Sequence, residues 1–254
     1  MKRNIKKWIA YSSVLVCLIV CGTLMISWIR DERKIADAVD FYEELQEEHT
    51  SVLGSVNLNA EELIQIPVDF EALYEVNEDI YAWIDIEDTN VHYPILQHAK
   101  DDSYYLEHTV DRVAGLPGSI YTEKVNAKDF SDYITLVYGH DMRDGSMFKH
   151  LHKFSDEEFF KEHDVITIYT ENKIYQYRVY AAVAYDNRHI MYSFDKDDPA
   201  DRESFIQSLH DMKNSRNQYR DGMEVDENSK LLVLSTCITG QPDKRWIVVS
   251  SLIE

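Results

Sequence analysis

The sequence is poor in cysteine, glycine, proline and positive charge. Its 254 residues include 3 Cys, 8 Gly and 5 Pro. Three cysteines cannot form a disulfide-rich scaffold, and so little glycine and proline excludes a collagen-like or low-complexity chain. The 26 Lys and Arg residues stand against 46 Asp and Glu, which gives a net charge of -20. Because so acidic a surface repels phosphate, we expect no nucleic-acid partner.

Apolar residues are abundant enough for a packed core. Hydrophobic residues make up 44% of the chain and charged residues 28%, so wholesale disorder is excluded. A length of 254 residues suits one domain of ordinary size with extra segments attached.

Residues 8–29 form an uncharged apolar run that follows four basic residues, Lys2, Arg3, Lys6 and Lys7. A helix of this length spans the roughly 30 Å hydrocarbon layer of a bilayer. A cleaved signal peptide is disfavoured, because its apolar core is typically about 7–15 residues and a small-residue cleavage site should follow. The basic residues favour an N-terminus inside the cell. The sequence therefore predicts a single-pass anchor in the cell membrane, with a cytoplasmic N-terminus and an extracellular C-terminal part.

This run divides the chain into four predicted parts. They are a cytoplasmic tail at 1–7, a transmembrane anchor at 8–29, a helical stalk and linker at 30–66, and a folded domain at 67–254. The stalk is predicted because apolar residues between positions 35 and 45 recur at helical spacing. Short helices are also expected over 59–65 and 70–77.

The folded domain is rich in short apolar, β-branched and aromatic runs separated by turn-forming residues. Eight strands are predicted, over residues 82–86, 91–96, 119–122, 133–138, 165–170, 174–185, 231–236 and 246–252. One long amphipathic helix is predicted over 199–215. So many short strands with few long helices indicate a mainly β fold with some α, in the form of a closed or nearly closed β-barrel.

Cys237 is the one cysteine outside the apolar run, because Cys17 and Cys21 lie within 8–29. It therefore has no partner for a disulfide within the folded domain. The stretch KLLVLSTC places this thiol at the end of a buried strand, where a rigid scaffold can present a reactive group to solvent. A thiol attacks only as the thiolate and needs a base or a cation beside it.

His140 and Arg245 are the best placed of the residues that could assist this thiol. His140 ends another apolar strand, ITLVYGH, and Gly139 before it leaves room for a substrate. Arg245 opens the last strand, and neighbouring strands would bring it beside Cys237. A guanidinium there can hydrogen-bond an oxyanion. Each residue alone also has an ordinary explanation, as a buried thiol, a surface histidine or a charge that ends a strand.

Taken together, the motifs LVYGHDMRDGSMF, LLVLSTC and RWIVVSSLI resemble the sortase family of membrane-anchored cysteine transpeptidases over roughly residues 60–254. The LSTC sequence and the helix at 199–215 resemble class B in particular. The resemblance implies an eight-stranded sortase-like β-barrel with N-terminal helices and a helix inserted before the penultimate strand. Two features depart from the class: Asp141 stands where Asn is usual, and the loop 238–244 is short. Asp141 could pair with His140, but we expect it to be a solvated turn residue.

The resemblance also implies the chemistry. Cys237 would be the nucleophile, His140 the general acid and base, and Arg245 the group that stabilises the transition state. The enzyme would cleave a C-terminal sorting motif of a secreted protein after Thr, through a thioester on Cys237. It would then join that protein to an amine of peptidoglycan or of its lipid-linked precursor. No cofactor or metal is implied, and Ser235, Thr236 and the loop 186–198 are candidates for contact with the substrate.

Two other functions remain open from the residues alone. An exported cysteine hydrolase of the papain-like or wall-amidase kind would place its Cys at the start of a helix and ahead of its His in the chain. Here His140 precedes Cys237, which ends a predicted strand. A non-catalytic, membrane-tethered binding domain is the second alternative, and it would hold Cys237 buried and inert.

Overall fold

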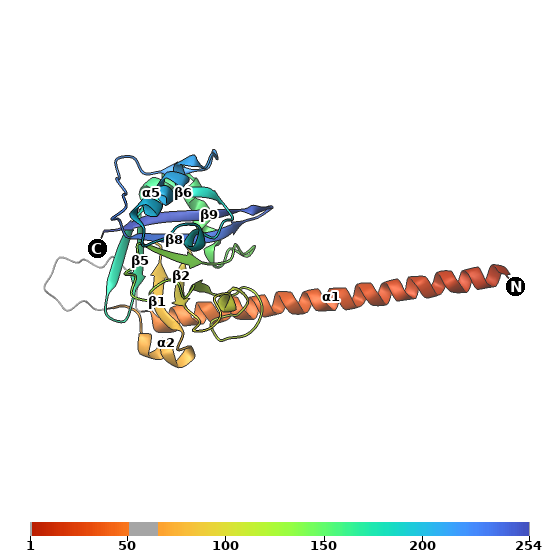
Figure 1. The fold of residues 1–254 in the computed structure, drawn as a ribbon. Helices are drawn as coiled ribbons and strands as arrows, with labels where there is room; N and C mark the ends of the chain where they lie inside the picture. The colour runs from red at the N-terminus through yellow and green to blue at the C-terminus, as the bar shows by residue number, and fades with distance from the viewer. Residues whose placement is uncertain (1, 51–65, 254) are drawn as a thin grey trace.

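The computed structural model describes residues 2–50 and 66–253, with side chains described from residue 15 onward. The helix expected over 59–65 lies outside these residues. Helix α1, Lys2–His49, is continuous and extends far from the rest of the molecule (Figure 1). Its C-terminal end packs against the folded domain through Tyr42 and Leu45, both buried. The Tyr42 hydroxyl lies 2.8 Å from the Gly118 carbonyl, to which it donates.

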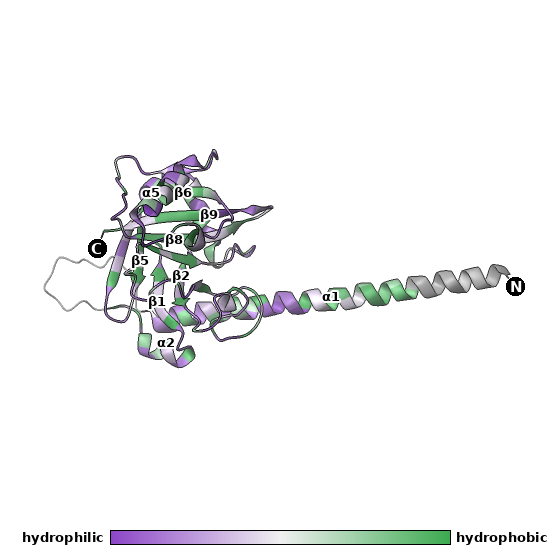
Figure 2. Ribbon diagram, in the orientation of Figure 1, coloured by the Kyte–Doolittle hydropathy of each residue, from purple (hydrophilic) through white to green (hydrophobic). Residues whose placement is uncertain are grey.

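The prediction of a membrane anchor over 8–29 is wrong. Among the described residues, none of the helices has a stretch that is both long enough and apolar enough to cross a bilayer. The apolar side chains of α1 reach as far as Ile29. The charged residues of 30–34 then follow, and Figure 2 shows this change from apolar to hydrophilic along the helix. The predicted cell-membrane location, with its cytoplasmic N-terminus and extracellular domain, is withdrawn with the anchor.

The folded domain is a closed β-barrel, as predicted. Its strands are β1 Ile80–Asp85, β2 His92–Leu96, β3 Ile120–Thr122, β4 Ile134–Tyr138, β5 Val165–Tyr169, β6 Ile174–Asp186, β8 Leu231–Ile238 and β9 Gln241–Leu252. They pair in the order β5-β1-β2-β3-β4-β8-β9-β6, and β6 pairs again with β5 to close the ring. The two-residue strand β7, Gln218–Tyr219, adds to β6 outside this ring and was not predicted.

Short helices surround the barrel. They are α2 Phe70–Val76, η1 Tyr104–Leu106, η2 Phe148–Ser155, α3 Glu157–Glu162, α4 Ile190–Ser193 and α5 Pro199–Asp211. The predicted helix before the penultimate strand is α5, which begins at the capping residue Asp198, whose side chain accepts a hydrogen bond from the Ala200 amide. It ends earlier than expected, because Met212 is extended and its carbonyl accepts a hydrogen bond from the side chain of Asn217.

Strands β8 and β9 are buried on both faces, and this arrangement positions the site. Alternate residues such as Leu232, Leu234 and Trp246 belong to the main core, which fills the barrel. The intervening Val233 and Ile247 belong to a second core with Phe205 and Leu209 of α5, which covers the outer face. Because successive side chains of a strand point to opposite faces, Ser235 and Cys237 lie on the outer face, and Thr236 lies on the inner face.

Candidate active site

The three residues singled out from the sequence lie at one end of the barrel, on or just after three neighbouring strands. Strands β4 and β8 are parallel, with Tyr138 opposite Ser235. The chain segments that carry His140 and Cys237 therefore leave the sheet at the same end. Strand β9 is antiparallel to β8, and its register places Arg245 directly opposite Cys237. Directly opposed residues of an antiparallel pair share a face of the sheet, so Cys237 and Arg245 lie side by side.

Cys237 is exposed, whereas the residues before it on β8 are buried. Ser235, on the same face, is 6% exposed, and Thr236, on the inner face, is 2% exposed. A rigid strand thus presents the thiol where the covering helices end. Thr236 faces the barrel interior, so its side chain is not placed to touch a substrate on the outer face.

His140 is held by its surroundings on two sides. Its Nε2–H donates to the Leu106 carbonyl, 2.7 Å away, and its own carbonyl accepts from the Phe148 amide. In the neutral ring this bond places the proton on Nε2 and leaves Nδ1 as the proton acceptor. The two neighbouring glycines allow close packing. A Cβ atom on Gly139 would lie 2.5 Å from the Ile120 side chain, and one on Gly118 would lie 3.1 Å from the imidazole of His140.

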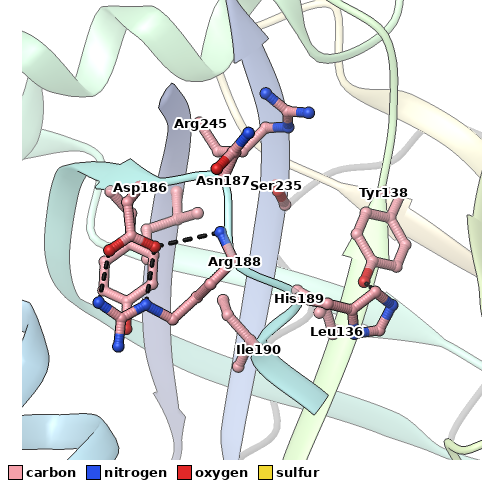
Figure 3. Close-up of a pocket in the computed structure, with 11 residues that line it drawn as sticks. Leu136, Tyr138, Asp186, Asn187, Arg188, His189, Ile190, Ser235 and Arg245 are labelled. Carbon is pink, nitrogen blue, oxygen red and sulfur yellow. Dashed lines mark hydrogen bonds and ion pairs between the residues drawn. The ribbon is translucent and has the colours of Figure 1, made fainter. Parts of the chain in front are cut away.

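A pocket of about 140 Å³ adjoins the outer face of β8 and β9. Ser235 and Arg245 line one side of it, and residues 186–190, which follow β6, line another (Figure 3). The Arg245 guanidinium donates to the Lys244 carbonyl (2.8 Å) and is half-buried. Across the pocket, the ion pair between Asp186 and Arg188 holds the 186–190 segment. The hydrogen bond from Arg188 lowers the pKa of Asp186, so this carboxylate remains ionised at neutral pH.

A second polar contact in the pocket was missed from the sequence. His189, which no motif in the sequence singles out, lines the pocket, and its Nε2 lies 2.9 Å from a carboxylate oxygen of Glu123. The Tyr138 hydroxyl lies 3.4 Å from the same nitrogen. Burial, with the nearby charge of Glu123, raises the pKa of Tyr138 well above its ordinary value, so the phenol stays protonated. No local spacing links residues 123, 138 and 189, and only the folded barrel brings them together.

A family model of the sortase domain matches residues 84–253. The chain belongs to the sortase family. Sortase B of Listeria monocytogenes is 31% identical over 193 residues, which cover 75% of this chain and 74% of that protein. Sortase B of Staphylococcus aureus is 25% identical over 244 residues, which cover 95% of this chain and 94% of that protein.

Solved sortase B structures share the fold. The X-ray structure of Clostridium perfringens sortase B has a TM-score of 0.65 at 26% identity, and the match covers 73% of this chain and all of that one (100%). The Staphylococcus aureus sortase B–substrate complex has a TM-score of 0.68 at 25% identity, covering 89% of this chain and 99% of that one. This sortase is therefore of class B, and sortases of this class are cysteine transpeptidases that anchor proteins bearing a sorting motif to the cell wall.

The family and the geometry together weigh against both alternatives. A papain-like hydrolase would carry its Cys at a helix start, whereas Cys237 lies on strand β8 of a sortase barrel. A non-catalytic binding domain was expected to bury Cys237, but the thiol is exposed.

The two departures from the usual class B sequence lie against each other. The expectation that Asp141 is a solvated turn residue is wrong, because its side chain is 3% exposed and pairs with Lys149, with 2.8 Å between Nζ and Oδ1. The short loop is a hairpin in which β9 begins at Gln241, and Gly240 adopts a φ of +79° at the turn. The hydroxyl of Thr239, the other turn residue, donates to Asp141 Oδ2 at 2.7 Å.

Proposed function

We propose that Cys237 is the nucleophile of this sortase and that it cleaves a C-terminal sorting motif after Thr. The thiolate attacks the Thr carbonyl, the C–N bond to the following residue breaks, and a thioester joins the Thr to Cys237. An amine of peptidoglycan or of its lipid-linked precursor then attacks this thioester. The carbonyl carbon passes to the amine, and the thiolate is released. The products are the cleaved C-terminal peptide and a protein joined by a new amide bond.

The observation that carries this proposal is the register of three strands. Cys237 opposes Arg245 on β9, and His140 follows the parallel strand β4 at the same end of the barrel. In the proposal, Arg245 donates hydrogen bonds to the oxyanion of the tetrahedral intermediate. His140 gives a proton to the leaving amine and later takes one from the incoming amine. Because Nε2–H is engaged with the Leu106 carbonyl, Nδ1 is the nitrogen that exchanges this proton.

The pocket beside Cys237 supports a peptide-binding role. We propose that Ser235 and residues 186–190, the part of the predicted loop 186–198 that lines the pocket, contact the sorting motif. We leave Thr236 out of this set because its side chain is buried on the other face of β8. The proposed catalytic domain is 67–254, and Tyr42, within the predicted stalk 30–66, packs onto it.

Peptide transfer by the full chain tests this function. The protein is incubated with a mixture of peptides containing Pro-X-Thr, with and without an added oligoglycine amine, and the products are read by mass spectrometry. We expect cleavage after Thr and an amine-dependent ligated product, both absent with Cys237→Ala.

The rate of labelling by iodoacetamide, localised to Cys237 by peptide mapping, distinguishes the remaining outcomes. A native thiol that reacts only after unfolding, in a protein that joins no peptide, would overturn the proposal. Hydrolysis without ligation under every amine tried would instead favour the hydrolase.

A further inference from the structure

Asp141, which follows His140 in the chain, has a buried carboxylate that has no part in the mechanism above. The Asp141 side chain is 3% exposed and contacts two other segments of the chain. In η2, the Lys149 ammonium lies 2.8 Å from Oδ1, and Nε2 of His152 lies 3.6 Å from Oδ2. In the β8–β9 hairpin, the Thr239 hydroxyl donates to Oδ2.

These contacts join the two segments that carry the reacting groups. Asp141 follows His140 in the chain, and Thr239 lies two residues after Cys237. His152 provides a second connection, because its Nε2–H donates to the Cys237 carbonyl at 3.1 Å. The backbone of the proposed nucleophile and the turn that follows it are thus tied, directly or through η2, to the residue next to the proposed acid and base.

The charge on Asp141 is maintained inside this cluster. Burial alone would raise the pKa of the carboxyl group, but the contacts with Lys149 and Thr239 outweigh that effect and lower it. Burial lowers the pKa of His152, so this ring is neutral at neutral pH and donates from Nε2 alone. A buried charge that lost these partners would be costly, so the ionised carboxylate favours the arrangement in which η2 and the hairpin both lie against it.

We propose that Asp141 is a positioning residue that fixes the Cys237 thiol relative to the His140 imidazole through Thr239, Lys149 and His152. It touches neither substrate nor the reacting atoms. The proposal rests on the function proposed above and deepens it. The rate of acyl transfer falls steeply when a nucleophile and its proton donor are displaced by as little as about 1 Å. Its role should therefore appear in the rate of the chemical step more than in substrate binding.

Asp141→Ala in the full chain is the first test, with transfer of the reactive Pro-X-Thr peptide to the oligoglycine amine as the assay. We expect kcat to fall by about tenfold to a hundredfold while KM changes by less than about twofold. Asp144→Asn is the matched control. Asp144 is in the same loop and its carboxylate caps the Ser146 amide, an acceptor role that Asn retains, without contact to His140 or Cys237. It should leave both constants unchanged.

The partner residue separates positioning from mere stabilisation and serves if Asp141→Ala does not fold. Thr239→Val removes the hydroxyl that donates to Asp141 and should lower kcat by about threefold to tenfold, whereas Thr239→Ser keeps the hydroxyl and should restore it. If kcat in folded Asp141→Ala stays within twofold of the unaltered protein, or if Thr239→Ser is as slow as Thr239→Val, the proposal is overturned.

Alkylation distinguishes this failure from failure of the proposed function. If the unaltered protein joins no peptide to the amine, the function has failed, and the rate of iodoacetamide reaction at Cys237 still tests the position of the thiol. A change of about threefold or more in that rate in Asp141→Ala, with none in Asp144→Asn, supports positioning of Cys237 by Asp141. Equal rates in the three proteins overturn it.

Discussion

The inner and outer faces of strand β8 carry similar residues for most of its length and differ only at its C-terminal end. Leu232 and Leu234 point into the barrel, and Leu231 and Val233 point towards α5, all of them buried. At the end, Thr236 and Ile238 on the inner face stay buried, whereas on the outer face the buried Ser235 is followed by the exposed Cys237. One strand therefore belongs to a closed core on one side and to an open site on the other.

This difference shows how a barrel can build one wall of a site from a packed strand. The inner residues fix the strand by packing, and a well-packed core tolerates little displacement. The outer residues at the same positions along the strand are then presented to solvent on a rigid backbone. Each face can be altered with little expected effect on the other, so substitutions on the two faces test the comparison directly.

Removal of the thiol on the outer face should have the largest effect. Cys237→Ala should reduce transpeptidation by at least about 10⁴-fold, because loss of a nucleophile removes the covalent route. The exposed site makes no large packing contribution, so the free energy of unfolding should change by less than about 0.5 kcal/mol. Peptide ligation and urea denaturation measure the two quantities. Cys237→Ser, which keeps the shape, should be comparably inactive, and activity of either variant within tenfold of the unaltered protein would contradict the assignment.

Substitution of Arg245, which is also on the outer face, should have the next largest effect on activity. Arg245→Lys keeps the charge but loses the planar guanidinium, and we expect kcat to fall by about 10²- to 10³-fold with little change in KM. Steady-state kinetics with the reactive peptide measure both constants. Lys244→Ala is the control, because it removes the neighbouring cation and keeps the carbonyl that accepts from Arg245. A rise in KM with unchanged kcat would show that Arg245 binds the substrate in its ground state.

Local patterns predicted the barrel well because its strands are short apolar, β-branched and aromatic runs bounded by turn-forming residues. Seven of the eight ring strands match their expected ranges to within two residues at each end, whereas β9 begins at Gln241, five residues earlier than expected. The LSTC and GH motifs single out the ends of β8 and β4, and these two parallel strands end on the same side of the barrel. Patterns along the chain could not reveal Asp141, since the hydroxyl of Thr239 that bonds it lies 98 residues away in sequence. The sequence predicts a loop over 238–244, where the structure has a hairpin at Gly240, because the mostly charged and polar residues from Gln241 to Arg245 do not resemble the start of a strand.

Substitution on the inner face should lower stability strongly and change the reaction rate little, the opposite of substitution on the outer face. Leu234 is fully buried, and Leu234→Ala should lower the free energy of unfolding by about 2–5 kcal/mol through lost burial and the cavity left behind. The folded fraction should retain kcat within a few-fold. Leu234→Met, which nearly conserves volume, should cost less than about 1.5 kcal/mol. Denaturant titration measures the free energy of unfolding, and an activity assay on the same samples measures kcat. A destabilisation under 1 kcal/mol for Leu234→Ala would contradict tight packing of the inner face.

Thr236 gives the smallest and sharpest test, because it lies beside Cys237 but on the inner face. Its hydroxyl is buried and, in the described part of the chain, has no hydrogen-bond partner. Thr236→Val keeps the shape and removes an unsatisfied polar group, so it should leave stability unchanged or raise it by about 1 kcal/mol.

The same substitution at Thr122 should have the opposite sign, because the hydroxyl of that buried residue bonds with the phenol of Tyr81 at 2.8 Å. Thr122→Val should therefore cost about 1–3 kcal/mol. Thermal unfolding compares the pair, and the ligation assay shows whether Thr236 matters to the substrate. Equal destabilisation by both variants would mean that the Thr236 hydroxyl has a bonding partner after all. A tenfold rise in KM for Thr236→Val would mean that the peptide reaches the inner face of β8 at this end. The contrast between a closed inner face and an open outer face would then not hold at the position of Thr236.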